Sequence, residues 1–188
     1  VTEAHPTLSE CIVRYFGEML PLIELVCPPV SLPGGELAKQ DPQHVQNVID
    51  LIAHHRLCRQ CYVLAIGGGA LIDMVGYAAA ISHRGIPLVR FPTTVLAQND
   101  AALSVKNAIN FNGAKNYMGT FTAPHSVICD TAFLASLDTR GWIGGISEAI
   151  KVALLRDVDF FHYIEEHVLA LRQRDLASMR HVIYRCAQ

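Results

Sequence analysis

Three consecutive glycines, Gly67 to Gly69, follow a short apolar run and precede a stretch of small residues. Successive glycines let backbone N–H groups approach a phosphate, and a helix that starts beyond them adds the positive end of its dipole. The run is not the dinucleotide fingerprint G-x-G-x-x-G, because Ile72 stands at the third glycine position, and it is not a Walker A loop. A nucleotide-binding turn and a plain strand-to-helix turn both remain open. Asp73 either stabilises the helix dipole or accepts a ribose hydroxyl.

A second group of polar residues follows the next apolar run. Thr93 and Thr94 come directly after Pro92, where hydroxyls either bind a ligand at the carboxyl end of a parallel strand or cap the following helix. Amides and two lysines then lie between residues 98 and 116, interleaved with apolar residues. Such donors suit a phosphate or a polyhydroxylated ligand, and the alternative is a solvated polar loop. The group comprises Gln98, Asn99, Asp100, Lys106, Asn107, Asn110, Lys115 and Asn116.

Two further pairs are weak signals by themselves. Glu148 and Lys151 are three residues apart and share a helix face, which indicates a surface ion pair. Cys58 and Cys61 form one C-x-x-C pair, without the second pair that a zinc site needs. We expect the six cysteines to be ordinary reduced thiols, as in a cytoplasmic protein.

Length and composition limit what these residues can belong to. The chain has 188 residues, a formal charge of −2, 51% hydrophobic and 17% charged residues. This charge gives no general case for nucleic acid or an anionic membrane as a partner, and no apolar run is long enough for a membrane span. The chain starts Val-Thr-Glu-Ala-His, without the pattern of a signal peptide.

The hydrophobic pattern predicts an α/β half followed by a helical half, with a boundary near residue 138. In the first half we expect helices from Thr7 to about Leu20 and from Asp41, with room for a short strand near residues 27–35. A strand at 62–66, a helix at 70–82 and a strand at 86–91 then form a βαβ unit. Residues 93–124 are expected to be irregular, and 126–130 to form one more strand. The chain is expected to be helical from about Trp142 onward.

Taken together, these segments resemble the 3-dehydroquinate synthase family of sugar-phosphate cyclases. The matching pieces are Pro33-Gly-Gly-Glu-Leu-Ala-Lys39, Gly67-Gly-Gly-Ala-Leu-Ile-Asp73, Arg84-Gly85, Pro92-Thr-Thr, Asp100 with Lys106, Lys115-Asn116 and Glu148-Ala-Ile-Lys151. They follow one another in the family's order and near its spacing. Family members are roughly twice as long as this chain. The resemblance therefore implies the central part of a dehydroquinate synthase-like fold, truncated at both ends: a partial Rossmann-like NAD-binding domain over 1–138 and the start of a helical metal- and substrate-binding domain over 139–188.

The resemblance also implies roles for individual residues. Glu36 and Lys39 would contact the adenosine end of NAD, Asp100 would lie near the reacting hydroxyl, and Glu148 would be a ligand of Zn²⁺ or Co²⁺ rather than a surface partner. Arg84 would complete the phosphate site of a neighbouring subunit in a homodimer. The implied cofactor residues are Gly34, Gly35, Glu36, Lys39, Gly68, Gly69, Asp73, Thr93, Thr94, Lys106, Lys115, Phe133, Leu134 and Ser136. The implied catalytic and substrate residues are Arg84, Asp100, Lys106, Asn116 and Lys151.

The reaction that the resemblance implies is a lyase-type cyclisation. NAD transiently oxidises a hydroxyl, phosphate leaves by β-elimination, the hydride returns, and an aldol addition closes a carbocycle. Divalent metal would polarise the reacting oxygens and lysines would neutralise the phosphate.

Two departures from the family pattern keep alternatives open. The run Asp100-Ala-Ala-Leu-Ser-Val-Lys106 is closer to valiolone-type cyclases, which act on sedoheptulose 7-phosphate, than to dehydroquinate synthases. The two histidine ligands of the family's metal have no counterpart motif here, so the remaining ligands are expected outside this chain. An iron-dependent alcohol or glycerol dehydrogenase and a non-catalytic NAD-binding remnant also remain as alternatives.

Overall fold

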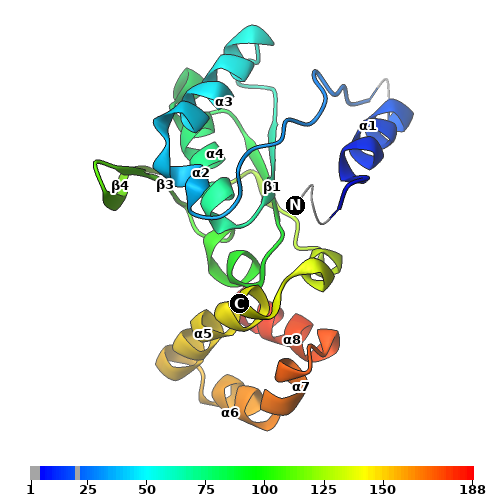
Figure 1. The fold of residues 1–188 in the computed structure, drawn as a ribbon, viewed down its shortest axis with the longest axis vertical. Coiled ribbons are helices and arrows are strands. Elements are labelled where there is room, and N and C mark those ends of the chain that lie inside the picture. The colour runs from blue at the N-terminus through cyan, green and yellow to red at the C-terminus, as the bar shows by residue number, and fades with distance from the viewer. Residues whose placement is uncertain (1–4, 20–21) are drawn as a thin grey trace.

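The computed structural model describes residues 5–19 and 22–188. Strands β1 (Val63–Gly67), β2 (Leu88–Pro92) and β5 (Ser126–Val127) form a parallel sheet in the order β1-β2-β5. Helix α4 (Gly69–Ile81) and the short helix η1 (Ser82–Arg84) connect β1 to β2, and α4 packs against α3 (Pro42–His54). The predicted βαβ unit is therefore confirmed, while the predicted strand at 126–130 is shorter (Figure 1).

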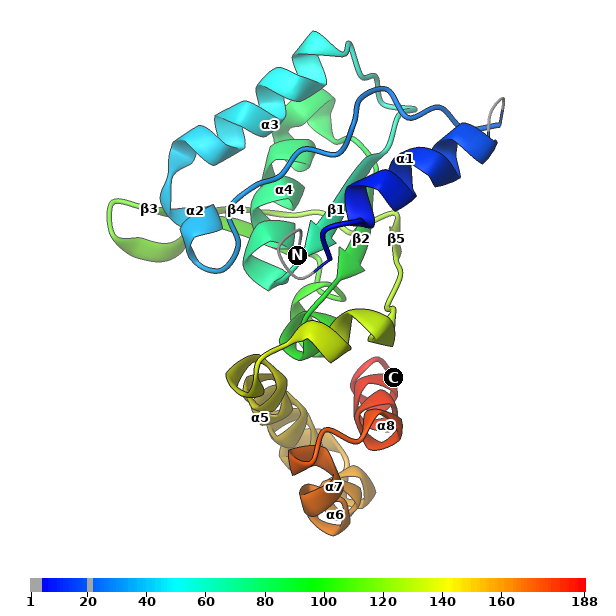
Figure 2. The same ribbon diagram turned by 45° about the vertical axis from the view of Figure 1, so that its right-hand side comes forward.

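The prediction of irregular structure over residues 93–124 is wrong for most of that range. A π-helix, η2 (Ala97–Ala101), is followed by an antiparallel hairpin of β3 (Lys106–Phe111) and β4 (Ala114–Phe121). Asn112 and Gly113 form its turn with φ of 49° and 79°. Positive φ at both central residues is typical of the type I′ turn, whose twist matches that of the flanking strands. The hairpin projects from the sheet domain in both views (Figures 1 and 2).

The N-terminal segments lie along the sheet half. Helix α1 (Leu8–Met19) and α3 confirm the two predicted helices, although the predicted end near Leu20 lies outside the described residues. Asp41 caps α3 by accepting the N–H of Gln43 at 2.9 Å, and Pro42 follows as the first helical residue. The short helix α2 (Leu37–Gln40) precedes it, and residues 22–36 contain no strand where one short strand had room.

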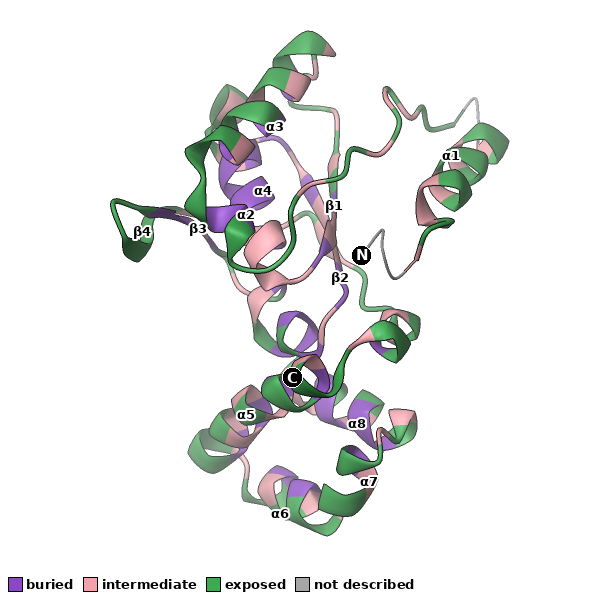
Figure 3. Ribbon diagram, viewed as in Figure 1, coloured by how far each residue is buried: buried purple, intermediate pink, exposed green. Residues whose placement is uncertain are grey.

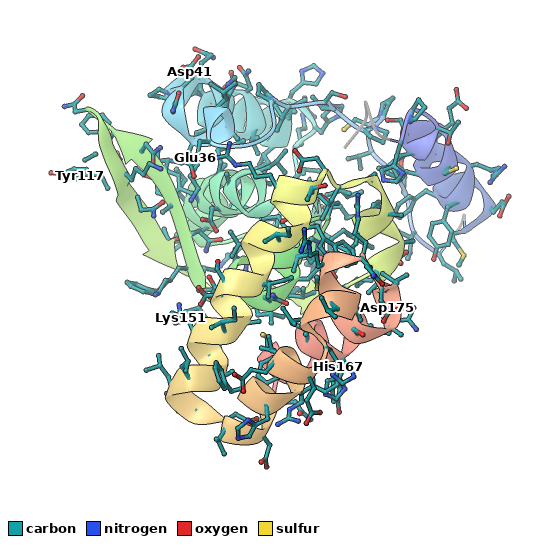
Figure 4. The ribbon with its side chains drawn as sticks, turned by 60° about the horizontal axis from the view of Figure 1, so that its bottom comes forward. Glu36, Asp41, Tyr117, Lys151, His167 and Asp175 are labelled. Atoms are coloured by element: carbon teal, nitrogen blue, oxygen red, sulfur yellow. The ribbon has the colours of Figure 1, made fainter. Side chains whose placement is uncertain are left out.

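The C-terminal part is helical, as predicted. The 3₁₀ helix η3 (Thr131–Ser136) leads into α5 (Thr139–Arg156), α6 (Val158–Glu166), α7 (Val168–Arg172) and α8 (Leu176–Cys186). Aspartates at residues 138, 157 and 175 cap α5, α6 and α8, and the last of them is labelled in Figure 4. Among the residues that the structure describes, no helix has the length and apolar character needed to cross a bilayer.

Two groups of buried side chains form the core (Figure 3). The first is centred on α4 and includes Ile72 and Met74, and the second is centred on Trp142 and Phe160. Val95, next to η2, belongs to the second group. Gly145 on α5 lies so close to this segment that a Cβ there would come within 2.5 Å of Val95 and of the Leu96 nitrogen. The helical half is therefore packed directly on η2, the element that carries Asp100.

Candidate functional site

A cleft of about 610 Å³ lies at the carboxyl ends of β1 and β2. In open α/β sheets this edge is where ligands bind. The cleft is lined on one side by the segment around Glu36 and on the other by Leu137 and Asp138, which precede α5. Of the residues predicted for the cofactor, the following line it: Gly34, Gly35, Glu36, Gly68, Gly69, Thr93, Thr94 and Ser136.

The start of α4 faces this cleft without a capping side chain. Helices α3, α5, α6 and α8 are each preceded by an aspartate whose side chain accepts a backbone N–H of the first turn, whereas α4 is preceded by Gly68. Gly68 and Gly69 also allow close packing, because a Cβ at Gly69 would lie 2.9 Å from the Cβ of Ala101. The first-turn N–H groups of a 13-residue helix are thus directed toward the cleft, where they can hold an anion.

Thr93 and Thr94 connect this turn to η2. The backbone N–H of Thr93 donates to Gly67 O at 2.9 Å, which continues the pairing of β2 with β1. The hydroxyl oxygen of Thr94 accepts the N–H of Ala97 at 3.1 Å. The capping role considered for this hydroxyl is therefore confirmed, and Thr94 also lines the cleft.

Lys39 and Asp73 form an ion pair beside the cleft rather than in it. The Lys39 side chain is 6% exposed, and its Nζ donates to Asp73 and to Asn116 Oδ1, the latter at 2.9 Å. Burial raises the pKa of Asp73, although the hydrogen bond and charge of Lys39 act in the opposite direction. This contact joins α2, α4 and β4, three elements that carry separate motifs of the sequence.

The amides of the hairpin complete this group. Asn110 Oδ1 accepts the backbone N–H of Asn116 at 2.9 Å, and Asn116 adopts a positive φ of 52°. Glu36 receives Asn110 Nδ2 at 3.5 Å and lies 3.8 Å from Lys115 Nζ. Both side chains of the Glu36–Lys115 pair are more than half exposed, so this pair contributes little to stability. Figure 4 shows Glu36 between α3 and the hairpin.

Arg90 is a buried cation that the sequence reasoning did not single out. It lies within the apolar strand β2 with 0% exposure. Its guanidinium donates to Ala102 O at 2.9 Å, to Ser104 O at 2.6 Å and to Asn107 Oδ1 at 2.7 Å. Burial lowers its pKa, and the charge of Asp73 partly offsets this. Arg90 therefore fixes the loop between Asp100 and Lys106. The sequence does contain a signal for this buried cation, because Arg90 is the one charged residue within the apolar run that forms β2.

Glu148 and Lys151 form the ion pair that their spacing predicts. The hydrogen bond that Lys151 donates to Glu148 raises the pKa of Lys151, and the charge of Asp100 adds to this effect. Asp100 is exposed near the end of η2, and its effect on the pKa of Lys151 indicates that it lies near the pair on α5. Within residues 5–19 and 22–188, no three His, Cys, Asp or Glu side chains are grouped so as to hold a metal ion.

Other predicted residues are not brought to the cleft. Arg84 lies beyond the C-terminal end of α4, about 20 Å along the helix from Gly69. Lys106 is exposed at the start of β3. Leu134 is fully buried in the second core group, and Phe133 packs edge-on against His5, whose Nε2 lies 3.0 Å from Ser136 Oγ.

The sequence contains a local signal for the turn between β3 and β4 that the prediction of an irregular region did not take into account. Asn-Gly is a favoured dipeptide of the type I′ hairpin turn, and the chain has it at Asn112-Gly113. Reading it would have placed Lys106 and Lys115 on paired strands.

The chain is similar to proteins of one enzyme family. It is 36% identical over 175 residues to a 3-dehydroquinate synthase of Halorhodospira halophila, covering 93% of this chain and 49% of that protein. The chain spans about half the length of the curated relatives it matches.

Solved structures agree with this similarity. A 2-epi-5-epi-valiolone synthase from Streptomyces hygroscopicus, with NAD⁺ and Zn²⁺ bound, shares 35% identity and a TM-score of 0.79 over 84% of this chain and 44% of that one. A 2-deoxy-scyllo-inosose synthase complexed with carbaglucose-6-phosphate, NAD⁺ and Co²⁺ shares 32% identity and a TM-score of 0.65, over 78% of this chain and 38% of that one. A protein from Sinorhizobium meliloti described as a probable glycerol dehydrogenase shares the fold alone, at 15% identity and a TM-score of 0.58 over 75% of this chain and 46% of that one.

The family model described as 3-dehydroquinate synthase N-terminal matches residues 29–144, the part of the chain that contains most of the cleft lining, the α4 turn and the hairpin. The chain therefore belongs to the 3-dehydroquinate synthase family.

Proposed function

We propose that this chain forms the NAD-binding part and the start of the helical part of a sugar-phosphate cyclase that eliminates phosphate. The observation that carries the proposal is the cleft. Eight of the residues implied for the cofactor line it, at the carboxyl edge of the sheet and beside the uncapped start of α4. Because the chain spans about half of its relatives, the activity is proposed for the complete protein.

The residues around the cleft fit NAD. Its volume of about 610 Å³ lies within the range of small-molecule sites. The N–H groups at Gly69 and Ala70 would hold the pyrophosphate, and Thr93 and Thr94 would border the nicotinamide half. The ammonium group of Lys39 is buried and paired with Asp73. Lys39 would therefore act on the adenosine end of NAD by positioning Asp73 rather than by binding it with a free charge. When bound, NAD would accept a hydride from the carbon that carries one substrate hydroxyl, and would return it later.

The donors outside the cleft suit a phosphorylated polyol. Lys106 and Lys151 would neutralise the leaving phosphate, and Asp100 would lie near the reacting hydroxyl. Since Asn116 Oδ1 accepts from Lys39, its Nδ2 group would donate to a substrate oxygen. Arg84, at the far end of α4, would serve a neighbouring subunit of a homodimer.

For the metal, the described residues offer one candidate ligand, Glu148, held by Lys151. They do not fit a complete Zn²⁺ site, which needs three protein ligands. The described residues by themselves therefore support no catalytic step through a metal, and we propose that further ligands lie outside this chain.

A valiolone-type cyclase acting on sedoheptulose 7-phosphate is the second candidate. Asp100-Ala-Ala and the valine before Lys106 favour it, and so does the TM-score of 0.79 with a valiolone synthase. Phosphate release by the complete protein, compared between the seven-carbon dehydroquinate precursor and sedoheptulose 7-phosphate, distinguishes the two. A dehydrogenase would instead accumulate NADH from a polyol without releasing phosphate.

The cofactor site can be tested on the chain itself with Ala70, which lines the cleft in the first turn of α4. Ala70→Asp adds a charge that favours the helix dipole but repels the pyrophosphate, so NAD affinity is expected to fall about tenfold while the fold is retained. Ala70→Asn adds similar volume without charge and is the matched control. Equal affinities of the two variants by calorimetry would place the pyrophosphate elsewhere.

A further inference from the structure

Cys58 and Cys61 lie on opposite ends of one tight turn between α3 and β1. The N–H of Cys61 donates to Cys58 O at 3.0 Å, and the two Sγ atoms are 3.7 Å apart. Both residues are free thiols, and Cys58 is exposed. The ends of such a turn are less than about 7 Å apart at Cα, the separation that a disulfide spans.

The fold holds this turn at both ends. Before it, Leu57 donates its N–H to Ile52 O at 3.0 Å and packs against the first core group. After it, Val63 donates to Pro87 O at 2.9 Å, and the ring of Tyr62 packs 4.8 Å from that of His125. These contacts hold the turn in place and keep the two thiols close together. An S–S bond between them therefore needs side-chain rotation and little backbone movement.

The two sulfurs differ from the other cysteines in their surroundings. The N–H of Gln60 donates to Cys58 Sγ at 3.4 Å, and the N–H of Cys58 lies 3.4 Å from Cys61 Sγ. The first of these bonds and the contact with Cys61 lower the pKa of Cys58. Burial instead raises the pKa of Cys129, and raises that of Cys186 to about 11. Since the thiolate is the nucleophile, Cys58 is the attacking thiol and Cys61 the one placed to resolve.

We propose that Cys58 and Cys61 form a redox-active dithiol, which a low-molecular-weight disulfide such as glutathione disulfide converts to an intrachain disulfide. The Cys58 thiolate attacks one sulfur of glutathione disulfide and releases one glutathione thiolate. Cys61, after losing its proton, attacks Cys58 Sγ in the mixed disulfide and releases the second glutathione. Two protein thiols are oxidised and one external disulfide is reduced to two thiols.

The pair is separate from the cofactor cleft. It precedes the N-terminal end of β1, and neither Cys58 nor Cys61 lines the cleft, whose lining along this strand begins at Leu64. The proposal therefore does not depend on the proposed function.

The experiment is a titration of the chain with mixtures of reduced and oxidised glutathione, followed by alkylation and peptide mapping by mass spectrometry. We expect the peptide with Cys58 and Cys61 to lose two hydrogens before any other cysteine is modified, and to recover them on reduction. Cys11, an exposed thiol on α1, serves as the internal reference. Modification of Cys11 before the pair would overturn the proposal.

Variants separate the two sulfurs. Cys61→Ser is expected to hold glutathione on Cys58 as a lasting mixed disulfide, because no resolving thiol remains. Cys58→Ser is expected to leave Cys61 largely unmodified, and Cys11→Ser, the matched control, to behave as the parent chain. If Cys61→Ser accumulated no mixed disulfide, or if both single variants reacted alike, the assigned roles would be wrong.

Discussion

The guanidinium of Arg90 donates to Oδ1 of Asn107 at 2.7 Å, and both side chains are buried. Arg90 belongs to β2 of the parallel sheet and Asn107 to β3 of the hairpin, so this bond joins two separate sheets. The same Asn107 oxygen would lie 1.9 Å from a Cβ at Gly76, which brings α4 into the contact. The loop from Asp100 to Lys106 is therefore held at both ends by buried polar contacts.

Arg90→Met is expected to lower the free energy of unfolding by about 3 kcal/mol, because two carbonyls and the Asn107 amide lose a charged donor in the interior. Urea unfolding measures this. Arg59→Met removes an exposed arginine and is expected to change stability by less than about 0.5 kcal/mol. Similar values for the two variants would contradict the role of Arg90.

The docking of α5 on η2 is tested by two adjacent glycines. Gly145→Ala is expected to cost about 1–3 kcal/mol, because the new methyl group would overlap Val95 and Leu96. Gly144→Ala meets no atom within 4 Å and is expected to stabilise the helix by about 0.5–1 kcal/mol. Thermal unfolding of both variants checks the difference. Equal shifts would show that α5 does not pack closely on this segment.

The start of α8 gives an expectation for pH. The hydroxyl and N–H of Ser178 donate to Asp175 and hold the pKa of Asp175 below its ordinary value. A carboxyl with a lowered folded pKa stabilises the fold above its unfolded pKa, and that stability is lost as pH falls from about 4 through the folded pKa. The stability advantage of the parent chain over Asp175→Asn is therefore expected to shrink on acidification. An advantage that stayed constant from neutral to acid pH, measured by urea unfolding, would contradict this.

Lys106 and Lys115 test the proposed chemistry in the complete protein. Both side chains are exposed, so Lys106→Ala and Lys115→Ala are expected to leave the melting temperature nearly unchanged. Turnover, measured as phosphate release, is expected to fall at least about a hundredfold, since each variant removes a charge-stabilising donor. Near-normal phosphate release by both variants would show that the hairpin lysines do not contact the reacting groups.

Metal content is expected to be negligible in the 188-residue chain. Glu148 is its one candidate ligand among the described residues, and the charge of Lys151 beside it opposes a cation. Elemental analysis of the purified chain after dialysis measures this. One tightly bound Zn²⁺ per chain, lost in Glu148→Ala, would mean that histidines of this chain complete a site.

The sequence alone determined the elements whose signals are local. Asp41-Pro42 predicted the start of α3, the glycines at 67–69 predicted the turn between β1 and α4, and the apolar run at 86–91 predicted β2. The order of short motifs also identified the family, which the match over residues 29–144 confirms. These features depend on residues a few positions apart, and the backbone preferences of Gly, Pro and Asp act over that range.

Tertiary structure decided how the motifs combine. The hairpin was predicted as irregular because its inward-facing residues, such as Asn107 and Asn110, are polar, and polar side chains lack the alternation of a half-buried strand. They can be buried because distant segments supply partners, Arg90 for Asn107 and Glu36 for Asn110. The pairing of Asp73 with Lys39 was likewise invisible at a separation of 34 residues. A buried polar group must find a hydrogen-bond partner wherever the fold provides one, and that choice is set by packing rather than by sequence spacing.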